Sequence, residues 1–170
     1  MIDIEKYSDL EKDLKKKVWD ILETVTDPEI PVLSIIDLGI VRNIQTSNDK
    51  LEIVITPTYS GCPAMDVITM NIRMALIKEG ISPFKIIQKL SPAWTTDWMT
   101  QAGKDRLKSY GIAPPAAKTF DANYLATLVV QCPLCHSSKT KLISEFGSTA
   151  CKALYQCLDC REPFDYFKCH

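Results

Sequence analysis

The chain lacks several features that would assign a protein quickly to a class. Its 170 residues contain no apolar run near the length of about twenty that a membrane helix needs, so we expect no membrane partner. The formal net charge is only −1, which argues against a nucleic-acid partner. Only two histidines are present, His136 and His170, and this disfavours a cysteine–histidine hydrolase. No internal repeat and no glycine-rich phosphate loop is evident.

The N-terminal stretch MIDIEKYSDLEKDLKKK is charged throughout and has no apolar core of the kind found in signal peptides. We therefore expect a cytoplasmic protein. In a reducing compartment, seven cysteines favour metal binding or thiol chemistry over disulfides.

Two Cys-x-x-Cys pairs stand near the C-terminus. Cys132 and Cys135 form the first pair and Cys157 and Cys160 the second, with 21 residues between the pairs. Each pair can turn two sulfurs toward one ion, and two such turns complete the tetrahedron of thiolates that Zn²⁺ accepts in closed structural sites. We predict a zinc site made of these four residues. Two disulfides, or reduced core cysteines, are the alternative.

Further soft ligands accompany the two pairs, namely Cys151, Cys169, His170 and His136. They could complete an alternative metal shell or receive a transient metal, but they rank below the two pairs. His136 and Arg161 follow the second cysteine of each pair, where a metal-binding turn usually has glycine with positive φ. If the turns are kept, each of these side chains costs about 1 kcal/mol.

Apolar spacing predicts helices over residues 8–25, 63–79 and 96–110 and strands over 39–45, 50–56 and 84–90. Ser8 and Glu11 have the spacing of a capping box at the first helix start. The order α-β-β-α-β-α describes a small domain with a three-stranded sheet. Two further strands, over 140–144 and 152–156, belong to a C-terminal zinc-ribbon-like β module. The predicted fold class is therefore α+β.

Residues 111–125 combine Gly, Ala and Pro-Pro, a composition typical of a semi-rigid linker. We predict a first domain over residues 1–110 and a second over 126–170. The second domain is too small to hold a core by itself, so we expect a bound metal to supply its folding energy.

Two loops of the first domain carry side chains suited to a site. The turn over residues 26–31 contains two prolines and presents Asp27 and Glu29 on a rigid backbone, either as turn caps or as an acidic pair beside a site. Cys62 precedes Pro63 at an expected helix start, where unpaired N–H groups and the helix dipole stabilise a thiolate. Such a cysteine suits a soft ligand or a nucleophile, and an inert buried cysteine is the alternative.

Several of these motifs resemble known families. The stretches TDPEIPVLSIIDLGIV and ITPTYSGCPAMDVI resemble the domain shared by iron–sulfur assembly factors of the SufT type and their cytosolic eukaryotic relatives. The C-terminal stretch EFGSTACKALYQCLDCREPFDYFKCH closely resembles the PaaD family of accessory proteins of the bacterial phenylacetyl-CoA epoxidase system. The resemblance spans about residues 15–170. The Tyr-Ser-Gly spacer before Cys62 is a departure from the family pattern, since many relatives have a shorter approach to this cysteine, and the resemblance therefore does not fix the direction of the thiol.

The resemblance implies a non-catalytic maturation factor in aerobic phenylacetate degradation. Such a factor helps to insert an iron–sulfur cluster into the epoxidase reductase or iron into its di-iron oxygenase. The implied partners are these components and the iron–sulfur assembly machinery, and the implied cofactors are Zn²⁺ and a transient iron–sulfur cluster. The site residues carried over are Cys62, with Asp27 and Glu29 beside it.

Two other classes of function remain open at this point. The first is a scaffold subunit that docks on the oxygenase or the reductase without handling metal. The second is a thiol oxidoreductase that uses Cys62 or Cys151.

Overall fold

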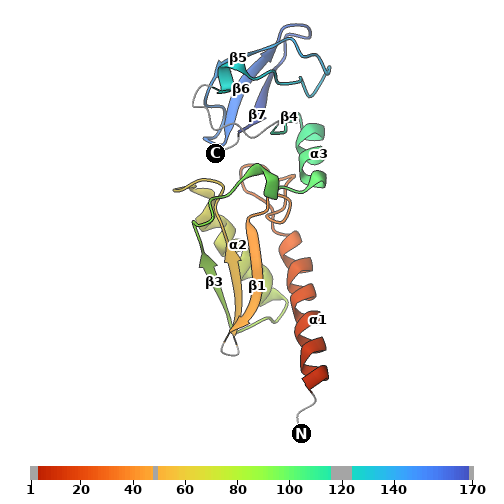
Figure 1. Cartoon of the computed structure of the whole chain (residues 1–170), viewed down its shortest axis with the longest axis vertical. Helices are drawn as coiled ribbons and strands as arrows, with labels where there is room; N and C mark the ends of the chain where they lie inside the picture. The colour runs from red at the N-terminus through yellow and green to blue at the C-terminus, as the bar shows by residue number, and fades with distance from the viewer. Residues whose placement is uncertain (1–3, 48–49, 116–123, 169–170) are drawn as a thin grey trace. The chain divides into compact units, whose positions relative to one another are not determined.

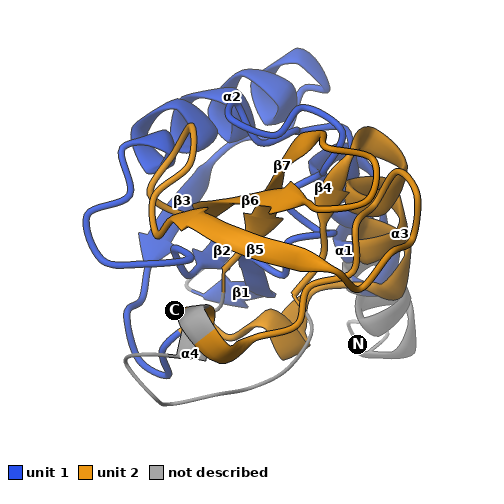
Figure 2. Cartoon of the chain, turned by 90° about the horizontal axis from the view of Figure 1, so that it is seen from above, with its two compact units in different colours: residues 1–93 blue, residues 94–170 orange. Residues whose placement is uncertain are grey.

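The computed structural model describes residues 4–47, 50–115 and 124–168 of the chain. The chain forms two compact units, unit 1 over Met1–Ala93 and unit 2 over Trp94–His170 (Figure 2). Each unit has its own sheet and its own core.

Unit 1 is a three-stranded sheet with two helices (Figure 1). Its elements are α1 (Ile4–Glu23), β1 (Val41–Ser47), β2 (Lys50–Ile55), α2 (Ala64–Lys78) and β3 (Phe84–Gln88). The strand order is β1-β2-β3, with β1 antiparallel and β3 parallel to β2. The helix α2 makes the crossover connection that parallel neighbours require.

The core of unit 1 follows from the spacing of apolar residues along its strands and helices. In β2 the alternate residues Leu51, Ile53 and Ile55 are buried, and Val54 on the opposite face is buried as well. Each of the two helices also has a buried apolar stripe, which comprises Val18 and Leu22 on α1 and Met65, Ile68, Ile72 and Leu76 on α2.

The strand pairing brings two loops to one end of this sheet. Val41, the first residue of β1, pairs with Ile55, the last residue of β2. Because β3 is parallel to β2, its last residue, Gln88, also pairs with Ile55. The loop before β1, over residues 24–40, and the loop after β2, over residues 56–63, therefore lie at the same end of the sheet.

Unit 2 contains a four-stranded sheet of order β4-β7-β6-β5. Its elements are the short 3₁₀ helix η1 (Thr96–Trp98), α3 (Gln101–Tyr110), β4 (Ile112–Ala113), α4 (Tyr124–Thr127), β5 (Thr140–Ser144), β6 (Lys152–Cys157) and β7 (Pro163–Phe167). The strands β5, β6 and β7 pair antiparallel, and β4 adds to β7 in parallel.

Aromatic side chains dominate the core of unit 2. The ring of Tyr155 lies 6.0 Å from Phe164 and 5.8 Å from Tyr166, measured between centroids. Its hydroxyl donates to the Leu125 carbonyl at 2.7 Å, which satisfies the buried polar end of the side chain. Burial raises the pKa of Tyr155 above its ordinary value. Trp94 meets Phe167 edge to face at 6.2 Å.

The structure confirms the α+β class, the three-stranded sheet and the ribbon-like C-terminal sheet. The first predicted helix start is wrong, because α1 already runs from Ile4 and Ser8 lies inside it. No proline or glycine lies between Ile4 and Ser8 to interrupt the helix. The capping-box spacing by itself therefore did not identify the N-terminal end of α1.

The predicted helix over 96–110 divides into η1 and α3. Thr100 is the N-cap of α3, and its hydroxyl accepts from the Gly103 N–H at 2.9 Å. This helix lies in unit 2, whereas the sequence placed it in the first domain. It leads directly into β4, inside the expected linker, and β4 pairs with β7. Residues 116–123 of that linker lie outside the described residues.

No helix in the described part of the chain combines the length and the apolar character needed to cross a membrane.

Replacing Ile53 by Ala tests the core of unit 1. Ile53 is fully buried, so we expect a loss of about 2–5 kcal/mol in the free energy of unfolding. The matched control is Met74→Ala, because Met74 is 63% exposed on α2 and its truncation should change stability by no more than about 0.5 kcal/mol. Urea unfolding followed by circular dichroism measures both. Equal midpoints for the two variants would contradict this description of the core.

Candidate metal centre and cysteine site

Two tight turns carry the Cys-x-x-Cys pairs, and we call residues 132–137 the first knuckle and residues 157–162 the second. In the first knuckle the Cys132 N–H donates to the Ser137 carbonyl at 2.9 Å. In the second the Cys157 N–H donates to the Glu162 carbonyl at 3.0 Å. The same bond over the same spacing closes both turns, so each presents its two sulfurs in the same way.

The four sulfurs of the two knuckles come together. The Sγ atoms of Cys132, Cys135, Cys157 and Cys160 all lie within 4.8 Å of one another, with Cys132 to Cys160 at 3.8 Å and Cys135 to Cys157 at 3.5 Å. A tetrahedral zinc site with Zn–S bonds of about 2.3 Å has sulfur–sulfur edges of about 3.8 Å. The thiol set therefore fits a zinc ion in its donor type, number and spacing.

The site is asymmetric in burial. Cys132 and Cys157 are fully buried and belong to the apolar core of unit 2, together with Val130 and Tyr155. Cys135 is exposed. One side of the site is thus anchored in the core, and the other side faces solvent.

The thiols also differ in acidity. Backbone N–H groups of Cys160 and Asp159 hydrogen-bond to the Cys157 sulfur and, against the effect of desolvation, lower the pKa of this thiol to about 7. The Cys160 sulfur accepts from the Glu162 N–H, but desolvation and the neighbouring thiols outweigh this bond and raise its pKa to about 12. The four groups cannot all ionise without a cation, so metal binding releases protons and strengthens as the pH rises.

Each knuckle contains one non-glycine residue with positive φ, as the turn geometry predicted. The φ angle is 62° at His136 and 69° at Arg161. A glutamine side chain holds each of these residues: Gln131 Nε2 donates to the His136 carbonyl at 3.1 Å, and Gln156 Nε2 donates to the Arg161 carbonyl at 3.1 Å. The strained residue is therefore fixed at its carbonyl in both turns.

Two of the secondary ligand candidates, His136 and Cys151, do not join the four cysteines. His136 is exposed and outside the converging set. Cys151 is buried, with its Sγ 3.0 Å from Thr149 Oγ1. Cys169 and His170 lie outside the described residues.

Cys62 is placed as its position before Pro63 predicts. Pro63 is the N-cap of α2, so Cys62 lies one residue before the helix end and its carbonyl accepts from the Met65 N–H at 3.2 Å. The side chain is half-buried and forms no disulfide. Its thiol stands in the loop after β2, at the sheet end shared with the loop that contains Asp27.

Asp27 and Glu29, two of the three acidic residues of that loop, differ in their surroundings. Asp27 is only 8% exposed, and its Oδ1 accepts from the N–H groups of Glu29 and Ile30, both at 2.8 Å. These bonds make Asp27 a turn-capping carboxylate that holds the shape of the loop. Glu29 is half-buried. Among the described residues, the four cysteines are the only set of three or more Cys, His, Asp or Glu side chains whose ligand atoms converge on one point.

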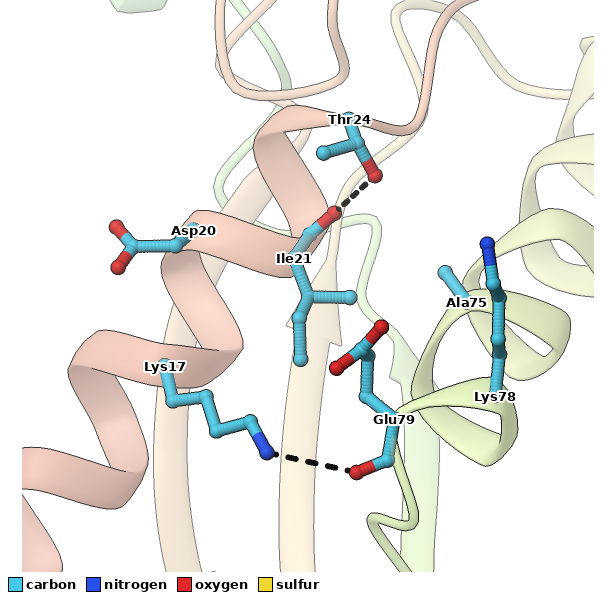
Figure 3. Close-up of a pocket in the computed structure, with 7 residues that line it drawn as sticks. All are labelled: Lys17, Asp20, Ile21, Thr24, Ala75, Lys78 and Glu79. Carbon is cyan, nitrogen blue, oxygen red and sulfur yellow. Dashed lines mark hydrogen bonds between the residues drawn. The ribbon is translucent and has the colours of Figure 1, made fainter.

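A hollow of about 500 Å³ lies elsewhere in unit 1, between α1 and α2 (Figure 3). It is lined by Lys17, Asp20, Ile21, Thr24, Ala75, Lys78 and Glu79. Lys17 Nζ donates to the Glu79 carbonyl at 3.4 Å across it. The hollow is at the C-terminal end of α2, a helix of 15 residues and thus about 22 Å long, whereas Cys62 is before its N-terminal end. It is not part of the cysteine site.

Comparison with known proteins assigns the two parts of the chain. Residues 15–80 match the family described as iron–sulfur cluster assembly protein, and residues 117–168 match the PaaD zinc beta ribbon domain. A protein of Escherichia coli strain K12 is 53% identical over 153 residues, which cover 90% of this chain and 92% of that protein. The chain belongs to the PaaD family. The Escherichia coli protein is provisionally named as a subunit of 1,2-phenylacetyl-CoA epoxidase.

Two further proteins are similar to somewhat more than half of this PaaD-family chain. An Fe-S protein maturation auxiliary factor, YitW of Bacillus subtilis strain 168, is 32% identical over 97 residues, covering 56% of this chain and 94% of that protein. A crystal structure from Bacillus anthracis, of a domain of unknown function named DUF59, superimposes with a TM-score of 0.55 at 24% identity. It covers 59% of this chain and 96% of that one, and it supports the fold of unit 1.

The side chains that surround the knuckles were not predicted from the sequence. Gln131 and Gln156 each stand directly before the first cysteine of a pair, so Gln-Cys-x-x-Cys occurs twice. This five-residue pattern was available in the sequence, but it is too short to register as an internal repeat. Ser137 and Asp159 also make contacts near the sulfurs, and no local pattern of the PaaD-family sequence marks them.

Glycine at the two strained positions should stabilise the metal-loaded chain. We expect His136→Gly and Arg161→Gly each to raise the free energy of unfolding by up to about 1 kcal/mol, since glycine adopts positive φ without a steric penalty. Ser138→Gly is the control, because Ser138 is not among the residues with positive φ and glycine there should be neutral or destabilising. Thermal unfolding with excess zinc measures all three variants, and a lower midpoint for both knuckle variants would contradict the strain argument.

Proposed function

We propose that this chain is a non-catalytic maturation factor of the phenylacetyl-CoA epoxidase system, acting in the cytoplasm. It assists insertion of an iron–sulfur cluster into the reductase component, with the iron of the oxygenase as the second possible target. The observation that carries the proposal is the union of two modules in one chain: an iron–sulfur assembly domain over residues 15–80 and a PaaD ribbon over residues 117–168. The names of its relatives, an epoxidase subunit and maturation auxiliary factors, support this reading.

Cys62 is our candidate for the residue that contacts the cluster or the iron. It is the only cysteine of unit 1, and the thiol is half-buried in a loop at the sheet end rather than sealed in the core. Clusters are held by several thiolates, so unit 1 by itself offers too few ligands for a resident cluster. The remaining ligands would come from the donor or the client protein. In this proposal the cluster is therefore cargo in transit.

Asp27 and Glu29 have separate parts in this proposal. The two backbone bonds to Asp27 Oδ1 hold the loop that lies at the same sheet end as Cys62. Glu29, which is half-buried in the same loop, is the acidic side chain that we propose contacts iron or a client protein.

In the same proposal the four cysteines of unit 2 hold a structural Zn²⁺. All four positions are taken by thiolates, which leaves no open coordination site for chemistry. When bound, the ion supplies the positive charge that lets four neighbouring thiols ionise together. It links two cysteine pairs that have 21 residues between them, and so it stabilises the ribbon against unfolding.

Removing one thiolate tests the zinc assignment. We expect the purified chain to contain about one Zn²⁺, and Cys135→Ser to lose most of it and to unfold unit 2 at lower temperature. Cys151→Ser is the matched control, since Cys151 lies outside the converging set and should leave the zinc content unchanged. Elemental analysis and circular dichroism provide the readouts. Full zinc content in Cys135→Ser would rule out the four-thiolate site.

The maturation proposal is tested on the reductase. We would produce the reductase with no added chain, with the wild-type chain, with Cys62→Ser and with Cys151→Ser, and measure iron and labile sulfide. The iron content of the oxygenase would be assayed in parallel. We expect several-fold lower cluster content without the chain and with Cys62→Ser, but normal content with Cys151→Ser.

The other outcomes are distinguishable. Full loading of both partners without the chain would reject maturation and favour a scaffold that docks without handling metal. Loading that needs the chain but tolerates Cys62→Ser would retain maturation and reject Cys62 as the contact residue.

A further inference from the structure

One contact joins the two knuckles on their solvent side. Asp159 stands between Cys157 and Cys160 in the second knuckle, but its carboxylate contacts residues at the end of the first. Ser137 Oγ donates to Asp159 Oδ2 at 2.6 Å, and Lys139 Nζ lies 3.4 Å from Asp159 Oδ1.

Ser137 connects this carboxylate to a metal-ligand turn. Its carbonyl accepts from the Cys132 N–H at 2.9 Å, in the bond that closes the first knuckle. Its hydroxyl also accepts from the Lys139 N–H at 3.0 Å, which fixes the direction in which the hydroxyl proton points. Beside it, the Leu158 N–H donates to the Lys139 carbonyl at 2.8 Å. The tip of the second knuckle therefore rests on the segment that leaves the first.

A carboxylate at this place has an electrostatic cost. Four thiolates around Zn²⁺ have a net charge of about −2, and Asp159 adds a further negative charge next to them. Lys139 offsets part of this charge, but the side chains of Lys139 and Asp159 are 76% and 47% exposed, and an exposed pair of this kind contributes little. Against this electrostatic cost stands one favourable interaction of Asp159, the short charge-assisted hydrogen bond from Ser137.

We propose that Asp159, acting through Ser137, is a positioning residue of the metal centre. Each knuckle sets the distance between its own two sulfurs, whereas the Ser137–Asp159 bond sets the distance between the two pairs on the exposed side. On the opposite side, Cys132 and Cys157 are already held by the core of unit 2. The bond thus keeps the exposed half of the site closed and slows loss of the metal. The inference rests on the proposed zinc centre.

The test uses two substitutions of the same shape at Ser137. Ser137→Thr keeps the hydroxyl, whereas Ser137→Val replaces it by a methyl group. We expect Ser137→Val and Asp159→Ala to weaken zinc binding about 10-fold in competition with a chelator, and Ser137→Thr to stay close to wild type. The full-length chain is used throughout.

Two further measurements separate positioning from general stability. The Co²⁺-loaded protein reports the symmetry of the thiolate set in its visible absorption, and we expect this spectrum to change in Ser137→Val and not in Ser137→Thr. Lys141→Ala is a surface control on the neighbouring strand β5, and Lys139→Ala isolates the exposed ion pair. Both should leave zinc affinity within about twofold, since exposed pairs contribute little.

Unchanged affinity and an unchanged Co²⁺ spectrum in Ser137→Val and Asp159→Ala would overturn the inference while leaving the zinc centre intact. Failure of the wild-type chain to bind zinc would instead reject the zinc centre itself. If Ser137→Val does not fold, Asp159→Ala decides the question by itself: it removes the acceptor of the Ser137 hydrogen bond, so it should weaken zinc binding, and wild-type affinity would overturn the inference.

Discussion

Unit 2 depends on the convergence of four thiols from two distant turns. Bringing these groups within 4.8 Å of one another is unfavourable when they ionise without a cation, because like charges repel at short range. The surrounding structure places the four cysteines in different environments. Cys132 and Cys157 are embedded in the aromatic core, while Cys135 stays exposed. A metal ion at the centre would turn this repulsion into attraction and join the core to the exposed turns.

Unit 1 contains a cysteine that stands alone and outside any cluster. Cys62 has no second cysteine in its unit, and it sits in a loop at the sheet end instead of in a closed cage. The pairing of Ile55 with both Val41 and Gln88 brings the neighbouring loops to that end. The chain thus combines four clustered thiols, a set suited to a structural metal ion, with a single thiol suited to transient contact with a ligand. This division agrees with an accessory protein that handles cargo for other proteins.

Local sequence determined most of the elements and the two turns that carry the cysteine pairs. The apolar residues Leu51, Ile53 and Ile55 at every second position define a strand, and the Cys-x-x-Cys spacing confines each pair of sulfurs to one turn. The expected positive φ at His136 and Arg161 followed from the same local turn geometry. These predictions succeeded because each depends on neighbours within a few residues.

Tertiary structure alone decided the rest. The short strand β4 lies in a stretch that reads as a linker, and only its pairing with β7, some fifty residues later, places α3 in unit 2. The Ser137–Asp159 bond likewise joins residues 22 positions apart, which local periodicity does not encode. Sequence thus determined which thiols can meet a metal, because their spacing is local. The fold decided what holds them together, because those contacts join distant segments.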